Sequence, residues 1–377
     1  MGKAKTPPRK QATETAKASP KKSPAAVEGQ IAHLDAELAK LFQDRAKLVL
    51  ELASLGAAPS EAAFASGLTL GALGELLERS QGPLPKRSLQ AIFGELLSGC
   101  RSLVKPLRVA FLGPLYSYSH LAALQRFGQG VEYVPVGSIA AVFEEVDRGH
   151  SDFGLAPIEN STDGRIADTL DMFTRQPVRV CGEVEMRIHH TLLGKCPRTD
   201  VKEVYSRPQA ISQCRNWLAK HLPGARTVEV TSTTTAAQLA KEKPGAAAIA
   251  SRQAAVHYGL DVLAENIEDN PSNSTRFAVI GGAAPPCTGN DRTAMLFQVE
   301  HRPGTLADAM NIFKSHKVNL TWIESFPIPN SDRAYLFFVE MEGHESDARL
   351  QRAVAALKRK ALRLEILGSF PATNTVE

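Results

Sequence analysis

The chain has 377 residues, a length that exceeds one ordinary hydrophobic core and favours two or three domains. Its hydrophobic content of 43% and charged content of 22% are those of a globular protein, and no apolar run is long enough to span a membrane. The N-terminus lacks the apolar core of a secretory signal, so we expect a soluble cytoplasmic protein.

The five cysteines are widely spaced, and none forms a C-x-x-C pair. An odd number of separated cysteines indicates neither a disulfide framework nor a zinc site. We therefore expect reduced thiols that are buried or neutral. These residues are Cys100, Cys181, Cys196, Cys214 and Cys287.

Residues 1–26 form a basic tail with seven lysines and arginines and one acidic residue. The net charge of +4 therefore conceals a net acidic remainder. The tail has almost no large apolar residues, which predicts disorder. We interpret it as a solubilising extension, ahead of a non-specific polyanion contact or an organelle transit peptide. Neither a specific nucleic acid nor a membrane is predicted as a partner.

Residues 27–106 predict a small all-helical module. From about Gln30, leucines recur at spacings of three, four and seven, which is one face of a helix. Arg45 lies on that face, where it either keeps its charged head in water or binds a ligand. A second helix is expected over residues 68–78, and a third after Pro85. The apolar positions of the first helix are Leu34, Leu38, Leu41, Leu48 and Leu52.

Residues 107–283 alternate between helix-like and strand-like segments, which predicts an α/β domain. Strands are expected over residues 108–114, 131–136, 153–158, 178–184, 201–206, 227–232, 246–250 and 277–280. Helices are expected over residues 139–149, 209–221 and 235–241.

A loop rich in glycine, alanine and proline precedes a last module, residues 291–370. Strands are expected there over residues 294–299, 319–325, 333–341 and 362–366, and helices over 305–315 and 346–359. The order β-α-β-β-α-β predicts an α+β ferredoxin-like fold.

Four polar clusters in the central region lie beside predicted strands, where ligands bind in α/β sheets. Ser119, in the first cluster, is a candidate helix N-cap, and the free N–H groups of such a helix start can hold an anion. A hydroxyl-rich turn at residues 232–235 indicates another N-cap. The clusters are Tyr116–His120, Glu159–Gly164, Ser206–Gln209 with Gln213, and Ser272–Arg276.

The sequence has no P-loop, no H-E-x-x-H and no G-x-S-x-G motif. The inferred site is instead built from amides, hydroxyls, helix termini and a few charges. Such a site binds a small oxyanion-rich molecule and assists departure of a poor leaving group by hydrogen bonding.

Residues 108–282 resemble a prephenate dehydratase domain nearly from end to end. Six ordered segments carry the resemblance: residues 109–119, 157–171, 182–193, 205–218, 232–237 and 247–281. Residues 292–368 resemble an ACT domain, through Pro303-Gly304-Thr305-Leu306 and Glu324-Ser325-Phe326-Pro327. Residues 29–106 resemble, more weakly, the AroQ-type chorismate mutase of bifunctional P-proteins. The implied fold is multi-domain: an all-α module, a two-lobed α/β catalytic domain like that of periplasmic binding proteins, and the ACT domain.

The resemblance implies that prephenate loses carbon dioxide and its ring hydroxyl together, which gives phenylpyruvate for phenylalanine biosynthesis. Thr275 occupies the position of the catalytic threonine and would hydrogen-bond the departing oxygen. Closure of the two lobes would exclude water, and no metal or organic cofactor is required. The implied substrate-binding residues are Asn160, Ser161, Glu159, Gln213, Arg276, Ser117, Ser119 and Ser206.

The ACT resemblance implies feedback regulation by phenylalanine and a homodimer or homotetramer, because such domains commonly pair. The implied regulatory residues are Pro303, Gly304, Thr305, Leu306, Asn319, Leu320, Glu324 and Ser325. Four positions depart from the family patterns. Tyr116 and Ser117 stand where the first loop usually has glycine and threonine. Arg207 replaces a histidine, and Phe326 replaces the arginine of the second ACT turn.

The mutase resemblance retains Arg45, but Glu28 and Gly56 stand where cations are expected, and residues 68–71 carry no charge. A dianionic transition state needs those cations, so our hypothesis is a helical remnant without mutase activity. Three alternatives stay open: a fully bifunctional mutase and dehydratase, a non-catalytic sensor of small carboxylates, and a preference for arogenate over prephenate.

Overall fold

The computed structural model describes residues 23–55, 79–282, 284–328 and 335–372. The chain divides into two compact units, Met1–Glu51 and Leu52–Glu377. Most of the basic tail and the expected helix over residues 68–78 lie outside the described residues. In the part of the chain that is described, no helix has the length and apolar character needed to cross a membrane.

The first unit contains most of α1 (Pro24–Ser54), which confirms the helix predicted from its leucine spacing. None of its residues is buried, and the predicted apolar face, including Leu41 and Leu48, remains exposed. Arg45 is half-buried, and its Nη1 atom has no hydrogen-bond partner among the described residues.

Helix α4 (Lys86–Val104) confirms the helix predicted after Pro85, but it belongs to the second unit, not with α1. Its Ser98 hydroxyl donates to the carbonyl of Phe127 at 2.6 Å and accepts from the N–H of Gly130 at 3.0 Å. A side chain at Gly130 would lie 2.6 Å from the Ser98 carbonyl, so the absence of one permits this close approach. These contacts join α4 to the α/β region of the second unit.

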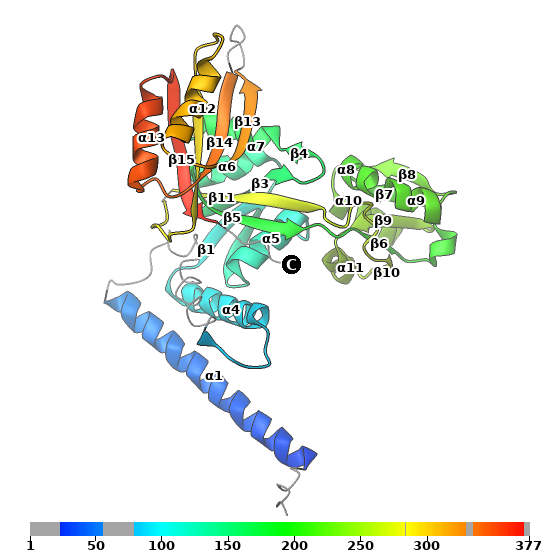
Figure 1. The fold of residues 1–377 in the computed structure, drawn as a ribbon. Helices are drawn as coiled ribbons and strands as arrows, with labels where there is room; N and C mark the ends of the chain where they lie inside the picture. Colours follow the sequence, from blue (N-terminus) through cyan, green and yellow to red (C-terminus); the bar gives the residue numbers. More distant parts are fainter. Residues whose placement is uncertain (1–22, 56–78, 283, 329–334, 373–377) are drawn as a thin grey trace, which may run out of the picture. The chain divides into compact units, whose positions relative to one another are not determined.

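The first α/β lobe is built on a six-stranded sheet of order β2-β1-β3-β11-β5, with β4 paired to β3 (Figure 1). Its strands are β1 (Leu107–Leu112), β2 (Val131–Val136), β3 (Phe153–Asn160), β4 (Gly164–Arg165), β5 (Arg179–Arg187) and β11 (Ser274–Gly281). Its helices are α5 (Tyr118–Phe127), α6 (Ile139–Asp147) and α7 (Ala167–Arg175). Side chains alternate along β1, so Ala110 packs with α6 and α7 while Val109 and Phe111 pack with α5.

The second lobe is inserted in the chain between β5 and β11. Its five-stranded sheet has the order β10-β6-β9-β7-β8. The strands are β6 (Thr191–Gly194), β7 (Glu203–Ser206), β8 (Arg226–Glu229), β9 (Ala246–Ala250) and β10 (Asp261–Ala264). The helices are α8 (Pro208–Gln213), α9 (Arg215–His221), α10 (Thr233–Glu242), α11 (Arg252–Tyr258) and the 3₁₀ turn η1 (Arg198–Asp200).

The prediction of one helix over residues 209–221 was wrong, because the helical conformation is interrupted at Cys214, between α8 and α9. The carboxylate of Asp269 accepts hydrogen bonds from the backbone N–H groups of Asn216 and Trp217, at 2.9 and 3.0 Å. This acceptor comes from a distant part of the sequence and satisfies the orphan donors at the start of a new helix. Periodicity within residues 209–221 does not reveal it.

The last module has a four-stranded antiparallel sheet of order β13-β14-β12-β15. Its elements are β12 (Asp291–Gln298), α12 (Thr305–Ser315), β13 (Leu320–Pro327), β14 (Tyr335–Glu342), α13 (Ala348–Lys358) and β15 (Arg363–Pro371). This order confirms the predicted β-α-β-β-α-β arrangement. One sheet face packs on α12 and α13 through a core that includes Phe297, Phe313 and Leu357.

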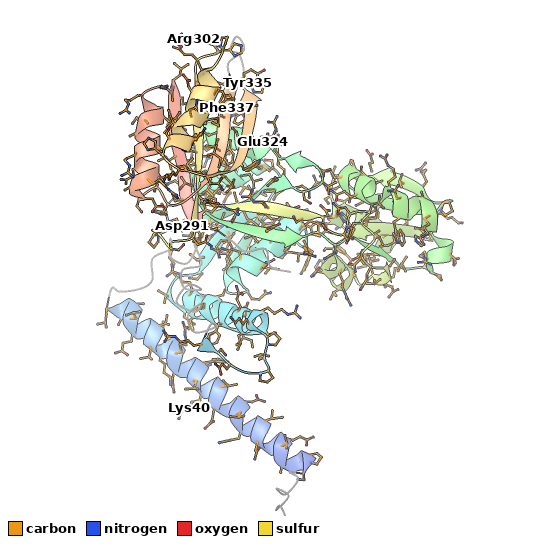
Figure 2. The ribbon with its side chains drawn as sticks, viewed as in Figure 1. Lys40, Asp291, Arg302, Glu324, Tyr335 and Phe337 are labelled. Carbon is orange, nitrogen blue, oxygen red and sulfur yellow. The ribbon has the colours of Figure 1, made fainter. Side chains whose placement is uncertain are left out.

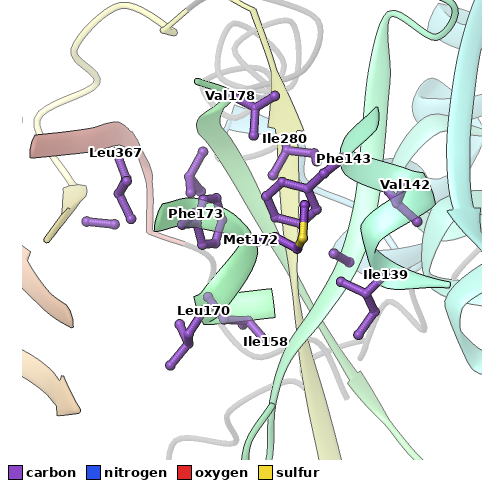
Figure 3. Packing of buried hydrophobic residues seen from close by; sticks show 14 of the residues in the cluster. Ile139, Val142, Phe143, Ile158, Leu170, Met172, Phe173, Val178, Ile280 and Leu367 are labelled. Atoms are coloured by element: carbon purple, nitrogen blue, oxygen red, sulfur yellow. The ribbon is translucent and has the colours of Figure 1, made fainter. Parts of the chain in front are cut away.

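The other face of this sheet shares a hydrophobic core with the first lobe. Leu367 of β15 joins the cluster around Phe143 and Phe173, whose rings meet edge to face with centroids 5.0 Å apart (Figure 3). Gly368 follows at φ 151°, and a Cβ atom there would lie 2.1 Å from the carbonyl oxygen of Val180 on β5. The approach of β15 to β5 therefore requires glycine at this position.

We predict that Gly368→Ala lowers the free energy of unfolding by about 3 kcal/mol, because the new methyl group forces two backbones apart. The control is Gly289→Ala, at φ 90° with open space around it, which should cost about 1 kcal/mol through backbone strain. Urea unfolding measures both variants. Equal losses would contradict the close approach of the two strands.

Candidate functional site

Strand ends and helix starts from both lobes enclose a cleft of about 620 Å³. This volume lies within the range of small-molecule sites. Among the predicted site residues, the structure brings five into the lining. They are Thr275, Asn160, Gln213, Ser117 and Ser119.

Thr275 lies on β11 and is 9% exposed. It pairs with Asn160 on β3, and the register between these strands shifts directly after Arg276. Such a bulge re-aims side chains, which is common beside functional sites. Thr275 and Phe277 both line the cleft, whereas Arg276, between them in the sequence, does not.

The amide of Asn160 has one orientation that fits its neighbours. Its oxygen accepts from the backbone N–H groups of Thr162 and Asp163, both at 3.0 Å. Its nitrogen must then face the acceptors on the other side, and it donates to the Thr275 hydroxyl oxygen at 2.9 Å. Because that oxygen accepts this bond, the Thr275 hydrogen stays available as a donor.

Gln213 is oriented in the same way. Its nitrogen donates to the carboxylate of Asp163 at 3.0 Å, so its oxygen accepts from Asn273 at 3.0 Å and from Nε2 of His190 at 2.9 Å. The Asn273 amide oxygen in turn accepts from Asn160 at 3.1 Å. The amides thus form a continuous network from Asp163 to Thr275.

His190 and Tyr118 extend this network into the cleft wall. Burial lowers the pKa of His190 despite the opposing effects of its Gln213 hydrogen bond and of Glu268, so the neutral ring carries its proton on Nε2. Nδ1 lies 3.1 Å from the Tyr118 hydroxyl. Burial, reinforced by Cys214 and Glu268, raises the pKa of Tyr118, so this phenol also stays neutral. Both groups line the cleft as uncharged hydrogen-bonding partners.

The starts of α5, α6, α7 and α10 contribute residues to the lining of the cleft. Ser117, Ser138 and Ser232 cap three of these helices by accepting a backbone N–H with the side chain. The remaining free N–H groups and the positive ends of the helix dipoles favour anions. The cleft is therefore suited to a small molecule with more than one anionic group.

Four charged side chains also line the cleft: Arg165, Arg207, Asp163 and Asp168. Arg165 is held by Glu324 at 3.0 Å and by the carbonyl of Ser325 at 2.6 Å, both on β13. Arg207 is exposed at the start of α8. Because two cations and two carboxylates balance, the helix starts decide the cleft's preference for anions.

The expectation that Ser119 caps a helix was wrong, although this residue does line the cleft. Ser117 is the N-cap of α5, and its hydroxyl accepts from the N–H of His120 at 3.3 Å. Ser117 has the extended backbone of a cap, whereas Ser119 is already inside the first helical turn.

The structure does not place Arg276 or Glu159 in the cleft lining. The Arg276 guanidinium bonds Glu159 and Glu183 at 2.9 Å and Glu340 of β14 at 2.8 Å, and it lies over the ring of Trp322. Burial opposes its charge, but Glu340 and Glu183 outweigh that effect and raise the pKa of Arg276. This position does not support binding of a substrate carboxylate by Arg276, because the guanidinium is fully engaged between the first lobe and the last module.

Ser161 and Ser206 are also outside the lining. The Ser206 hydroxyl is fully buried and donates to the carbonyl of Ile249 at 2.7 Å. The Ser161 hydroxyl accepts from the N–H of Ser274 at 2.9 Å, one residue before Thr275. Both hydroxyls hold backbone segments in place.

The structure brings four of the eight predicted regulatory residues into one pocket. A second pocket of about 390 Å³ in the last module is lined by Gly304, Thr305, Leu306 and Ser325. Other lining residues include Arg302, Tyr335 and Phe337 (Figure 2). The remaining predictions lie outside this lining: Pro303, Asn319, Leu320 and Glu324. Asn319 bonds Glu342, and Glu324 bonds Arg165.

Sequence reasoning missed His190, Asp163 and Arg165 as individual lining residues, and it placed Tyr118 only in a cluster. The adjacent pair His189-His190, just before β6, was the available signal for His190. Within the described ranges, no group of three or more His, Cys, Asp or Glu side chains could hold a metal ion.

Residues 109–285 match a family model described as prephenate dehydratase. A protein of Stutzerimonas stutzeri named bifunctional chorismate mutase/prephenate dehydratase is 39% identical over 349 residues, which cover 91% of this chain and 96% of that protein. The structure of prephenate dehydratase from Arthrobacter aurescens in complex with L-Phe is 34% identical, with a TM-score of 0.66, and the match covers 71% of this chain and 90% of that one. A structure described as GqqA, a novel type of quorum quenching acylase, is 30% identical with a TM-score of 0.65, and the match covers 71% of this chain and 98% of that one.

Proposed function

Because the chain belongs to the prephenate dehydratase family, we propose that its cleft converts prephenate to phenylpyruvate, carbon dioxide and water in phenylalanine biosynthesis. In this reaction the bond to the ring carboxylate breaks and its electron pair enters the ring. The bond to the ring hydroxyl breaks at the same time, and the hydroxyl takes up a proton and leaves as water. Aromatisation supplies the driving force, so the protein chiefly needs to help the hydroxyl leave.

The arrangement of Thr275 and Asn160 carries this proposal. The Thr275 oxygen accepts from Asn160, which polarises the hydroxyl and leaves its hydrogen free to bond the departing oxygen. Asn160 cannot rotate away without abandoning the N–H groups of Thr162 and Asp163. A preorganised donor of this kind stabilises charge that develops on the leaving group.

The helix starts in the cleft supply partial positive charge for the two carboxylates of prephenate. They suit this reaction better than a directly paired cation would, because the ring carboxylate must lose its charge to leave as carbon dioxide. Neutral His190 and Tyr118 add hydrogen-bonding capacity without adding charge.

We predict that Thr275→Val, which keeps the shape but removes the hydroxyl, lowers kcat by about 100- to 1,000-fold. Thr275→Ser keeps a hydroxyl and should retain most of the activity. Formation of phenylpyruvate from prephenate measures both variants. A wild type that binds prephenate but forms no phenylpyruvate would instead favour the non-catalytic sensor.

Residues 291–370 are, in this proposal, an ACT domain that binds phenylalanine in the pocket beside Gly304 and Ser325. The family member from Arthrobacter aurescens was solved in complex with L-Phe, which supports this ligand. The proposed catalytic domain covers residues 107–283, and the helical region covers residues 27–106. A homodimer or homotetramer and a cytoplasmic location complete the proposal.

We predict that Leu306→Ala raises the phenylalanine concentration for half-inhibition about ten-fold, because the pocket loses apolar contact with the ligand. Leu362→Ala is the matched control, since Leu362 is an exposed leucine of the same module outside the pocket. Initial rates of phenylpyruvate formation at increasing phenylalanine give both values. Equal inhibition of the two variants would place the ligand elsewhere.

The second candidate is a bifunctional enzyme, because the Stutzerimonas stutzeri relative bears that name and the match covers 91% of this chain. Against it, Glu28 and Gly56 stand where the mutase resemblance calls for cations. We therefore expect prephenate to be consumed but chorismate to remain. Chorismate consumption at a rate comparable to prephenate turnover would establish the bifunctional enzyme.

Acylase activity, the activity named for the GqqA structure, would need a nucleophile activated by a neighbouring base. The two ring nitrogens of His190 face Tyr118 and Gln213, so this histidine is not placed to activate a serine or cysteine. We therefore do not propose acylase activity for this cleft.

A further inference from the structure

The loop between β1 and α5, residues 113–117, reaches from the first lobe to the second. The carbonyl of Leu115 accepts from the hydroxyl of Thr234 on α10 at 3.3 Å. The carbonyl of Tyr116 accepts from the hydroxyl of Ser251, the N-cap of α11, at 3.0 Å. Two consecutive peptide units of the first lobe are thus held by side chains of the second.

Tyr116 has the left-handed backbone conformation, with φ 65°. A bulky residue rarely adopts this conformation, which persists only where surrounding contacts enforce it. The enforcing contacts are the two carbonyl bonds and a bond from the Tyr116 N–H to Nδ1 of His120 at 3.1 Å. The family pattern has glycine at this position, which adopts the conformation without strain.

The aromatic ring of Tyr116 makes packing contacts that a glycine at this position could not make. It stacks on His257 of α11 with centroids 4.2 Å apart and planes 25° apart. It also meets His120 of α5 edge to face, with centroids 5.6 Å apart. It also packs against the hydrophobic core of the second lobe. A side chain of the first lobe therefore completes the packing of the second.

This contact bears on the cleft because the next three residues, Ser117, Tyr118 and Ser119, form part of its lining. Any shift of the loop against α11 also shifts the start of α5, which presents its N–H groups to an anion. The ring of Tyr116 therefore fixes this wall of the cleft relative to the wall that the second lobe supplies.

We propose that Tyr116 is a positioning residue of the dehydratase, and that its stack on His257 holds the two lobes in the arrangement that binds prephenate. This inference rests on the proposed function. The pair, Tyr116 with His257, is an inter-lobe clamp that increases the fraction of molecules with a closed cleft. Apparent affinity scales with that fraction, so losing the clamp raises KM and leaves the chemistry of bound substrate unchanged.

The test compares Tyr116→Gly, Tyr116→Phe, His257→Ala and the double variant Tyr116→Gly/His257→Ala. Tyr116→Gly and His257→Ala should each raise KM for prephenate about two- to ten-fold, the factor expected for one aromatic pair, with kcat within about two-fold. Tyr116→Phe should match the wild type, since the Tyr116 hydroxyl makes no hydrogen bond to any described residue. The double variant should be no worse than the more affected single variant, because both remove the same contact.

The control is His221→Ala, which removes a stack of His221 on Trp217 at 4.6 Å that lies within α9 alone. It should leave KM unchanged. Glycine at position 116 relieves backbone strain but also removes a ring that packs on the core of the second lobe. The retained kcat, and not the melting temperature, therefore separates a change in positioning from a loss of folding.

A wild-type KM in Tyr116→Gly, or effects of the two single variants that add fully in the double variant, would overturn the clamp. A wild type without phenylpyruvate formation would overturn the proposed function instead. The clamp would then be judged by the same fold-changes in the Kd of prephenate, measured by calorimetry.

Discussion

One side-chain amide, that of Asn160, sets the geometry of the cleft. Its oxygen is satisfied by two backbone N–H groups of the loop that follows β3, and its nitrogen faces Thr275 across the pairing of β3 with β11. Because this partly buried amide must place both its acceptor and its donors, the loop and the hydroxyl are fixed together. Gln213 and His190 extend the same constraint into the second lobe. In the proposed mechanism, dehydration then needs no charged acid, since the hydroxyl polarised by Asn160 is already in place.

The strand that carries Thr275 also connects the cleft to the last module. Side chains alternate along β11, so Thr275 faces the cleft and Arg276 faces away from it. There Arg276 bonds Glu159 and Glu183 of the first lobe and Glu340 of β14. Arg165, in the cleft lining, is likewise bonded to Glu324 of β13. Together with the shared core around Leu367, these contacts make the last module part of the structural support of the proposed dehydratase site.

Local sequence patterns predicted most of the elements and part of the site. The alternation of apolar segments gave the α/β class, and α12 was predicted with its observed bounds. The polar clusters contained Thr275, Asn160 and Gln213, because strand ends in this sequence are marked by runs of polar residues. The same clusters also contained Arg276 and Ser206, and the run alone could not separate them from the lining residues. Whether a residue faces the cleft depends on strand register, and here that register includes a bulge.

The sequence by itself determined the family, the order of the secondary-structure elements in the last module and the small set of hydroxyls and amides from which the proposed dehydratase site is drawn. Those features follow from local periodicity and from motifs that are contiguous in the chain. Only the tertiary structure decided which of these residues share the cleft, that Asp269 accepts hydrogen bonds at the start of α9, and that Tyr116 of one lobe stacks on His257 of the other. Each of these depends on residues distant in sequence, and contacts of that kind are set by the packing of whole sheets and lobes.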